Sequence, residues 1–126
     1  RILCLDGGGS RGISSVASLN SLVDSVGGLQ ISDSFDFVVG TSTGAIIAFL
    51  VGLRRETSAQ AVQRYNALVA KIFTKTALST PLLLFTTATY EEAPFMDILS
   101  EILGDETMLD SRADPAVPYV FAVTSK

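Results

Sequence analysis

The chain has 126 residues, of which 48% are hydrophobic and 17% charged, a composition that excludes the intrinsically disordered class and fits one domain. The formal net charge is −4 and Arg54-Arg55 is the only basic pair, which argues against a nucleic-acid-binding protein. The longest apolar run, Ala45 to Leu53, is far shorter than the roughly 20 residues that span a membrane.

Cys4 is the only cysteine, so an intrachain disulfide is impossible and nothing indicates an oxidising compartment. Its place in the apolar run RILCLD predicts a small buried side chain. A cytoplasmic or peripheral-membrane location is favoured on this basis.

The first half of the chain alternates apolar strands with apolar helices. Ile2 to Leu5 is a short apolar run that predicts a buried strand. Ile13 to Val26 has helical spacing and stops at Gly27-Gly28. Phe35 to Val39 predicts the second strand, and Thr43 to Leu53 is apolar on nearly all sides, which predicts a buried helix.

The second half continues this alternation. Thr57 or Ser58 is expected to cap a third helix. The apolar positions of that helix are Ala61, Val62, Tyr65, Leu68, Val69 and Ile72. Glu91 to Leu103 predicts a fourth helix and Tyr119 to Val123 a third strand, while Pro81 to Tyr90 is ambiguous. The pattern predicts an α/β fold with a central, mainly parallel sheet.

The segment DGGGSRG, from Asp6 to Gly12, follows the first predicted strand and opens the first predicted helix. The residues that match the G-x-G-x-x-G spacing of a dinucleotide-binding loop are Gly7, Gly9 and Gly12. Such a loop also needs an acidic residue at the end of the second strand, whereas Asp33 and Asp36 precede that strand. Consecutive glycines at a helix N-terminus let backbone N–H groups point outward, toward a phosphate or toward an oxyanion formed during reaction. A turn without a ligand is the third interpretation.

The segment GTSTG, from Gly40 to Gly44, lies between the second predicted strand and the next helix. Ser42 between flanking glycines is typical of a nucleophile elbow, in which the small residues let strand and helix approach closely. Gly40, Thr41, Thr43 and Gly44 complete that elbow. Because loops at the carboxyl ends of neighbouring parallel strands converge, we expect the two glycine segments to form one acyl-transfer site.

RILCLDGGGSRG, the spacing to GTSTGAIIAF and the later YEEAPFMDIL stretch resemble the patatin-like phospholipase family, especially its calcium-independent phospholipase branch. The resemblance implies a three-layer patatin-like fold with helices on both faces of the sheet. It also implies a serine–aspartate dyad, which needs no histidine, and this chain has none. Ser42 is then the nucleophile. The residues implied for the oxyanion hole are Gly7, Gly8, Gly9, Ser10, Arg11 and Gly12, with Arg11 at the family's basic position.

The catalytic aspartate of the family lies in an Asp-Gly-Gly or Asp-Gly-Ala motif, and none follows Ser42 in this chain. We therefore expect residues 1–126 to be one patatin-like domain that stops before that motif and is inactive alone. No metal or organic cofactor is implied. The acidic stretch around Asp105, Glu106, Asp110 and Asp114 does not fit a calcium loop and is interpreted as a solvated connection.

The predicted function is hydrolysis of fatty-acyl esters in a phospholipid or other acyl lipid, of the phospholipase A or lysophospholipase type. A nucleotide-binding module that uses GGGSRG and a degenerate scaffold without chemistry stay open as alternatives. Leu82 to Phe85 is apolar, and we expect it in the core, with a peripheral membrane contact as the alternative. Flanking domains in a longer protein are expected, and nucleic-acid partners are not.

Overall fold

The fold is known from a computed structural model, which describes residues 1–76, 92–104, 107, 109 and 113–124. Three strands form one parallel sheet in the order β1-β2-β3. They are β1 (Ile2–Leu5), β2 (Phe37–Thr41) and β3 (Tyr119–Val123). Leu5 pairs with Gly40, and Gly40 pairs with Ala122. The predicted parallel α/β architecture is confirmed.

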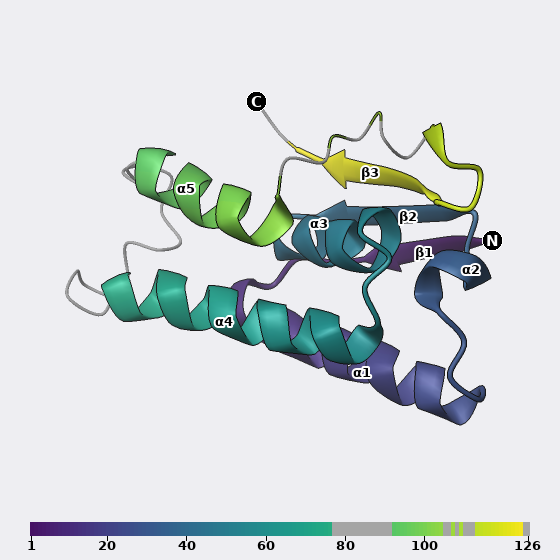
Figure 1. Ribbon diagram of the computed structural model, residues 1–126. Coiled ribbons are helices and arrows are strands. Elements are labelled where there is room, and N and C mark those ends of the chain that lie inside the picture. Colours follow the sequence, from purple (N-terminus) through teal and green to yellow (C-terminus); the bar gives the residue numbers. More distant parts are fainter. Residues whose placement is uncertain (77–91, 105–106, 108, 110–112, 125–126) are drawn as a thin grey trace.

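Along the chain, the helices lie in the connections between consecutive strands (Figure 1). They are η1 (Gly9–Arg11), α1 (Gly12–Ser25), α2 (Ile31–Ser34), α3 (Thr43–Ala48), η2 (Phe49–Leu53), α4 (Ser58–Thr76) and α5 (Glu92–Leu103). Thr57 caps α4 as predicted: its hydroxyl accepts the N–H of Gln60 at 3.2 Å, and the Gln60 side chain accepts the N–H of Thr57 at 2.9 Å. The four predicted helices therefore exist close to their predicted bounds.

One predicted boundary was wrong, and two local features were not predicted. β2 was predicted over Phe35–Val39 but begins at Phe37, because the N–H groups of Asp36 and Phe37 both donate to the carbonyl of Arg1 at the entrance to the sheet. The short helix α2 was not predicted. The helix after Ser42 winds as a π-helix over Phe49–Leu53 instead of staying α-helical to its end.

The core lies on one face of the sheet. Val38 and Val120 are buried there under α3 and η2, where a Cβ atom at Gly52 would lie 2.8 Å from Val120. The sheet alternation turns Phe37, Tyr119 and Phe121 to the other face, where their rings stack and remain exposed. Within the described residues the helices pack against the first face, so a covering layer on the second face stays a prediction.

Cys4 corrects a further expectation, since its side chain is exposed. Among the described residues β1 is an edge strand of the sheet, and its alternation sends Leu5 into the core and Cys4 to the open face. An apolar strand is therefore not buried on both sides in this part of the chain. No described helix is long and apolar enough to cross a membrane.

Candidate active site

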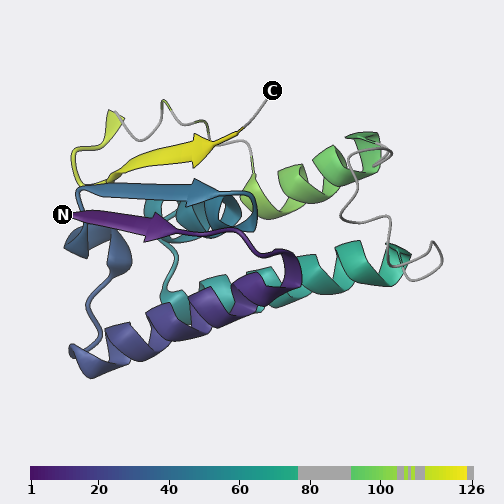
Figure 2. The same cartoon turned by 180° about the vertical axis from the view of Figure 1, so that it is seen from behind.

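The two glycine segments lie side by side at the carboxyl edge of the sheet. β1 and β2 are adjacent and parallel, so the chain leaves both strands at the same edge (Figure 2). The glycine loop, residues Asp6 to Gly12, follows β1, and the elbow, residues Gly40 to Gly44, joins β2 to α3. Gly44 ties the two together, because a Cβ atom there would lie 2.2 Å from the carbonyl oxygen of Leu5.

The elbow has the strained turn that its sequence predicts. Ser42 has φ 52° and ψ −126°, in a region that non-glycine residues seldom occupy. Gly40 and Gly44 make this turn possible, since a Cβ atom at Gly40 would lie 2.2 Å from the carbonyl oxygen of Gly44. The strain leaves Ser42 exposed at the N-cap of α3. The hydroxyl group of a serine held in this way is accessible from solvent.

Gly7 brings the glycine loop into contact with this serine. A Cβ atom at Gly7 would lie 2.7 Å from the Cβ atom of Ser42 and 3.4 Å from its Oγ atom. Only a glycine permits so close an approach between the two segments. The expected convergence of the two motifs is therefore present in the structure.

Hydroxyl groups fix three consecutive residues of the glycine loop. The Gly7 N–H donates to Thr41 Oγ1 at 3.1 Å, and the Gly8 N–H donates to Thr43 Oγ1 at 3.2 Å. The carbonyl of Gly9 accepts a hydrogen bond from the hydroxyl of Tyr65 at 2.5 Å. The loop is thus connected by side chains to the elbow on one side and to α4 on the other.

The loop then turns into α1 through the short helix η1. The Arg11 N–H donates to the carbonyl of Gly8 at 3.1 Å, and the Gly12 N–H donates to the carbonyl of Gly9. Ser10 and Arg11 are exposed, whereas Gly12 is buried. In the described part of the chain, the amides of Gly9 and Ser10 have no protein acceptor. These amides are the ones available to an anion.

Asp6 contributes a carboxylate to the glycine loop, whereas Asp33 and Asp36 lie outside this site. Asp33 lies in α2 and pairs with Arg55 at 2.7 Å, and Asp36 precedes β2 at the opposite edge of the sheet. Among the described residues, no carboxylate is hydrogen-bonded to Ser42, and no cluster of metal ligands occurs. Leu82–Phe85 and most of the acidic stretch lie outside the described residues.

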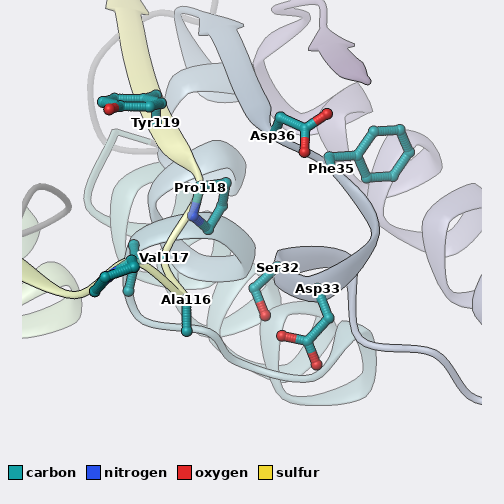
Figure 3. A pocket seen from close by; sticks show the side chains of 9 residues that line it. Ser32, Asp33, Phe35, Asp36, Ala116, Val117, Pro118 and Tyr119 are labelled. Carbon is teal, nitrogen blue, oxygen red and sulfur yellow. The ribbon is translucent and has the colours of Figure 1, made fainter.

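A separate cavity of about 390 Å³ lies at the amino edge of the sheet, away from the glycine segments. Figure 3 shows Ser32 and Asp33 of α2 on one side, and Ala116 to Pro118, which precede β3, on the other. Its lining contains no residue of either glycine segment.

Sequence reasoning missed the hydroxyl groups that hold the glycine loop. Thr41 and Thr43 were interpreted as parts of the elbow, without a role toward Gly7 and Gly8. Tyr65 was counted among the apolar positions of its helix. The available signal was its phenolic hydroxyl, since a buried tyrosine normally finds a hydrogen-bond partner.

The chain was also compared with known proteins. The family model for patatin-like phospholipases matches residues 3–126. Calcium-independent phospholipase A2-gamma of Rattus norvegicus is 33% identical over 126 residues, which cover 99% of this chain and 16% of that protein. The 85/88 kDa calcium-independent phospholipase A2 of the same species is 30% identical over 116 residues, covering 92% and 13%.

A bacterial relative extends the comparison. The cUMP-AMP-activated phospholipase of Escherichia coli is 33% identical over 110 residues, which cover 87% of this chain and 31% of that protein. The chain thus spans less than a third of the length of each of these three relatives. No solved structure matches. With a family match over nearly all its residues, the chain belongs to the patatin-like phospholipase family.

Proposed function

We propose that the protein is a lipid acyl hydrolase of the phospholipase A or lysophospholipase type, with Ser42 as its nucleophile. The observation that carries this proposal is the contact between Gly7 and Ser42 at the strained turn after β2. It places a glycine loop rich in backbone donors against an exposed serine. Membership of the family and the names of the relatives support a phospholipid or other acyl-lipid substrate.

The proposed reaction has two steps. A base takes the proton of the Ser42 hydroxyl while Oγ attacks the ester carbonyl, and collapse of the tetrahedral intermediate expels the lipid alcohol with that proton. Water then attacks the acyl-enzyme, the fatty acid leaves, and Ser42 regains its proton. The family resemblance assigns the base to an aspartate in an Asp-Gly-Gly or Asp-Gly-Ala motif. Since none follows Ser42 in these 126 residues, we propose that the full-length protein supplies this aspartate elsewhere.

The oxyanion of each intermediate needs preorganised donors. The amides of Gly7 and Gly8 are already bonded to Thr41 and Thr43. The amides of Gly9 and Ser10 follow directly and have no protein acceptor among the described residues. We therefore assign the oxyanion to the part of the glycine loop that contains Gly9 and Ser10, with Gly7 and Gly8 fixing its position.

The nucleotide-binding alternative has less support. A dinucleotide site needs an acidic side chain at the carboxyl end of β2, where this chain has Thr41 and Ser42. Asp33 is engaged with Arg55 at the other edge of the sheet. Detection of a bound dinucleotide by native mass spectrometry of the full-length protein would favour this alternative.

The test uses the full-length protein and two serines that are both exposed, Ser42 and Ser10. A fluorophosphonate should label Ser42, and Ser42→Ala should abolish both labelling and hydrolysis of phospholipid vesicles. Ser10→Ala should retain labelling, because the side chain of Ser10 has no part in the proposed chemistry. Labelling of another serine, or turnover by Ser42→Ala, would contradict the assignment.

The catalytic activity of residues 1–126 in isolation is a separate part of the proposal. An unassisted serine hydroxyl is a poor nucleophile at neutral pH, so the isolated segment should hydrolyse esters negligibly. Activity should return when the continuous downstream sequence is present. Ser42-dependent turnover by the monodisperse segment would instead mean that one of its own carboxylates is the base. Absence of turnover in the full-length protein would favour a degenerate scaffold. We further propose that the full-length protein has flanking domains and contacts the lipid surface peripherally.

A further inference from the structure

Tyr65 connects the core of the molecule to the glycine loop. It lies in α4, its side chain is fully buried, and its hydroxyl donates to the carbonyl of Gly9 at 2.5 Å. Ala61 and Leu68 are buried on the same helix face, so the ring is held on both sides along the helix. The position of Tyr65 is thus set by packing, and the Gly9 carbonyl is held by the Tyr65 hydroxyl together with the N–H of Gly12.

The hydroxyl also leaves no room for a larger residue at the start of α1. A Cβ atom at Gly12 would lie 2.2 Å from the Tyr65 hydroxyl oxygen. The tyrosine therefore lies against Gly9, the first residue of η1, and against Gly12, which directly follows this short helix. A buried phenol with a short hydrogen bond to a main-chain carbonyl restrains that peptide group strongly.

Because the peptide bond is planar, this contact also fixes the direction of an N–H group in the proposed oxyanion site. In a trans peptide the C=O and N–H groups point in opposite directions. Since the Gly9 carbonyl points toward Tyr65, the N–H of Ser10, which belongs to the same peptide group, points away from α4. The preceding peptide is fixed in the same manner, because the Gly8 carbonyl accepts the N–H of Arg11.

We propose that Tyr65 is a positioning residue for the oxyanion hole, which it preorganises by holding the peptide group between Gly9 and Ser10. The inference rests on the proposed function, because it assigns a role within that same site. Tyr65 does not touch the substrate in this scheme. Its hydroxyl prevents the glycine-rich segment from rotating its amide donors away from the developing negative charge.

The test compares Tyr65→Phe with two controls in the full-length protein. Tyr65→Phe should lower kcat on the order of 10-fold and leave KM within about twofold, since the donors act mainly in the transition state. Tyr119→Phe removes an exposed hydroxyl at the distant start of β3 and should change neither value. Val120→Ala should lower Tm through a core cavity at β3, without lowering the kcat measured at temperatures below its melting range.

A second readout separates positioning from a structural role. An alkyl trifluoromethyl ketone adds to a serine as a tetrahedral oxyanion, so its affinity should fall with Tyr65→Phe by the same factor as kcat/KM. A product-like fatty acid should bind equally well to both proteins. A lower Tm with unchanged kcat and ketone affinity, or a rise in KM alone, would overturn the proposal.

If Tyr65→Phe does not fold, a fluorinated tyrosine at position 65 retains the packing and changes only the acidity of the donor. Turnover should then change while Tm stays within a few degrees, and an unchanged turnover would contradict the role. Failure of the proposed function is recognised separately, because in that case Ser42→Ala would match the wild type in turnover or the wild type would not turn over at all.

Discussion

The two glycine segments at the carboxyl edge of the sheet use glycine in different ways. In the elbow, Cβ atoms at Gly40 and Gly44 would each lie 2.2 Å from a backbone carbonyl oxygen. In the glycine loop, a Cβ atom at Gly8 would meet its nearest neighbour at 3.5 Å, and one at Gly9 would meet nothing within 4 Å. The elbow is closely packed, whereas the middle of the loop is open.

Their shapes are consequently determined by different forces. Close packing forces Ser42 into its strained φ of 52° and keeps it there. The loop is instead held by the hydroxyls of Thr41, Thr43 and Tyr65, which lie outside it. In the proposed mechanism, the strained turn exposes the Ser42 hydroxyl to the substrate, and the hydrogen bonds of the loop direct its amide donors toward the oxyanion. The predictions below separate these two effects.

The largest expected effect is the loss of the nucleophile. In the full-length protein, Ser42→Ala should lower kcat by several orders of magnitude, on the order of the losses seen when the serine of a serine hydrolase is removed. Its Tm should remain close to that of the wild type, since Ser42 is exposed. The measurement is phospholipid hydrolysis beside thermal unfolding, and turnover within a few-fold of wild type would contradict the proposed role.

The next effect tests the open loop. Gly9→Val should lower kcat by about 100-fold or more, because it displaces amide donors, while KM changes little. The valine also has to adopt φ +55°, so Tm should fall moderately. Gly28→Val is a control with a similar strain at φ +83° far from the site, and it should lower Tm without lowering kcat. A rise in KM alone would indicate a binding cradle instead of an oxyanion hole.

The packed elbow should respond through stability. Gly44→Ala should lower the free energy of unfolding by about 3 kcal/mol, because its methyl group collides with the main chain of Leu5. Gly8→Ala, with only ordinary contacts, should cost far less stability. Chemical unfolding of both variants measures the difference. Equal losses would show that the two segments are packed alike.

Loss of a hydrogen bond between a threonine hydroxyl and the glycine loop should have a smaller effect on kcat. Thr43→Val keeps the shape of the side chain and removes the acceptor of the Gly8 N–H, so kcat should fall by about 5- to 10-fold. Thr43→Ser retains the hydroxyl and should recover most of this loss. If the valine and serine variants have the same kcat, the bond does not orient the loop.

The smallest effect concerns the strain at Ser42. Ser42→Gly should be more stable than Ser42→Ala by about 1 kcal/mol, since glycine adopts φ 52° without steric cost. Both variants lack the Ser42 hydroxyl, so the comparison involves stability alone. A difference in Tm in the opposite direction would mean that the turn is not strained.

Much of the architecture was readable from local patterns. The apolar run Ile2–Leu5 and the periodicity between Ile13 and Val26 predicted β1 and α1 almost to the residue. α5 ends at Leu103 as predicted, and Gly104 follows it with φ 73°, a conformation typical of a helix C-terminus. The start of β2 was misplaced, since strand pairing with β1 and not apolar character decides where a strand begins.

The sequence by itself determined the elbow and the glycine loop, because each motif consists of consecutive residues whose backbone requirements are local. Those requirements alone indicated Ser42 and the segment Asp6–Gly12. Tertiary structure decided which hydroxyls hold the loop and which of its amides remain available. Tyr65 is 56 residues away from Gly9 along the chain. The spacing of the apolar positions in its helix is the same whether the Tyr65 hydroxyl donates to a carbonyl or not. Only the packing of α4 against the start of α1 places that hydroxyl beside the site, because the direction of a hydrogen bond across such a distance in sequence is fixed by the fold.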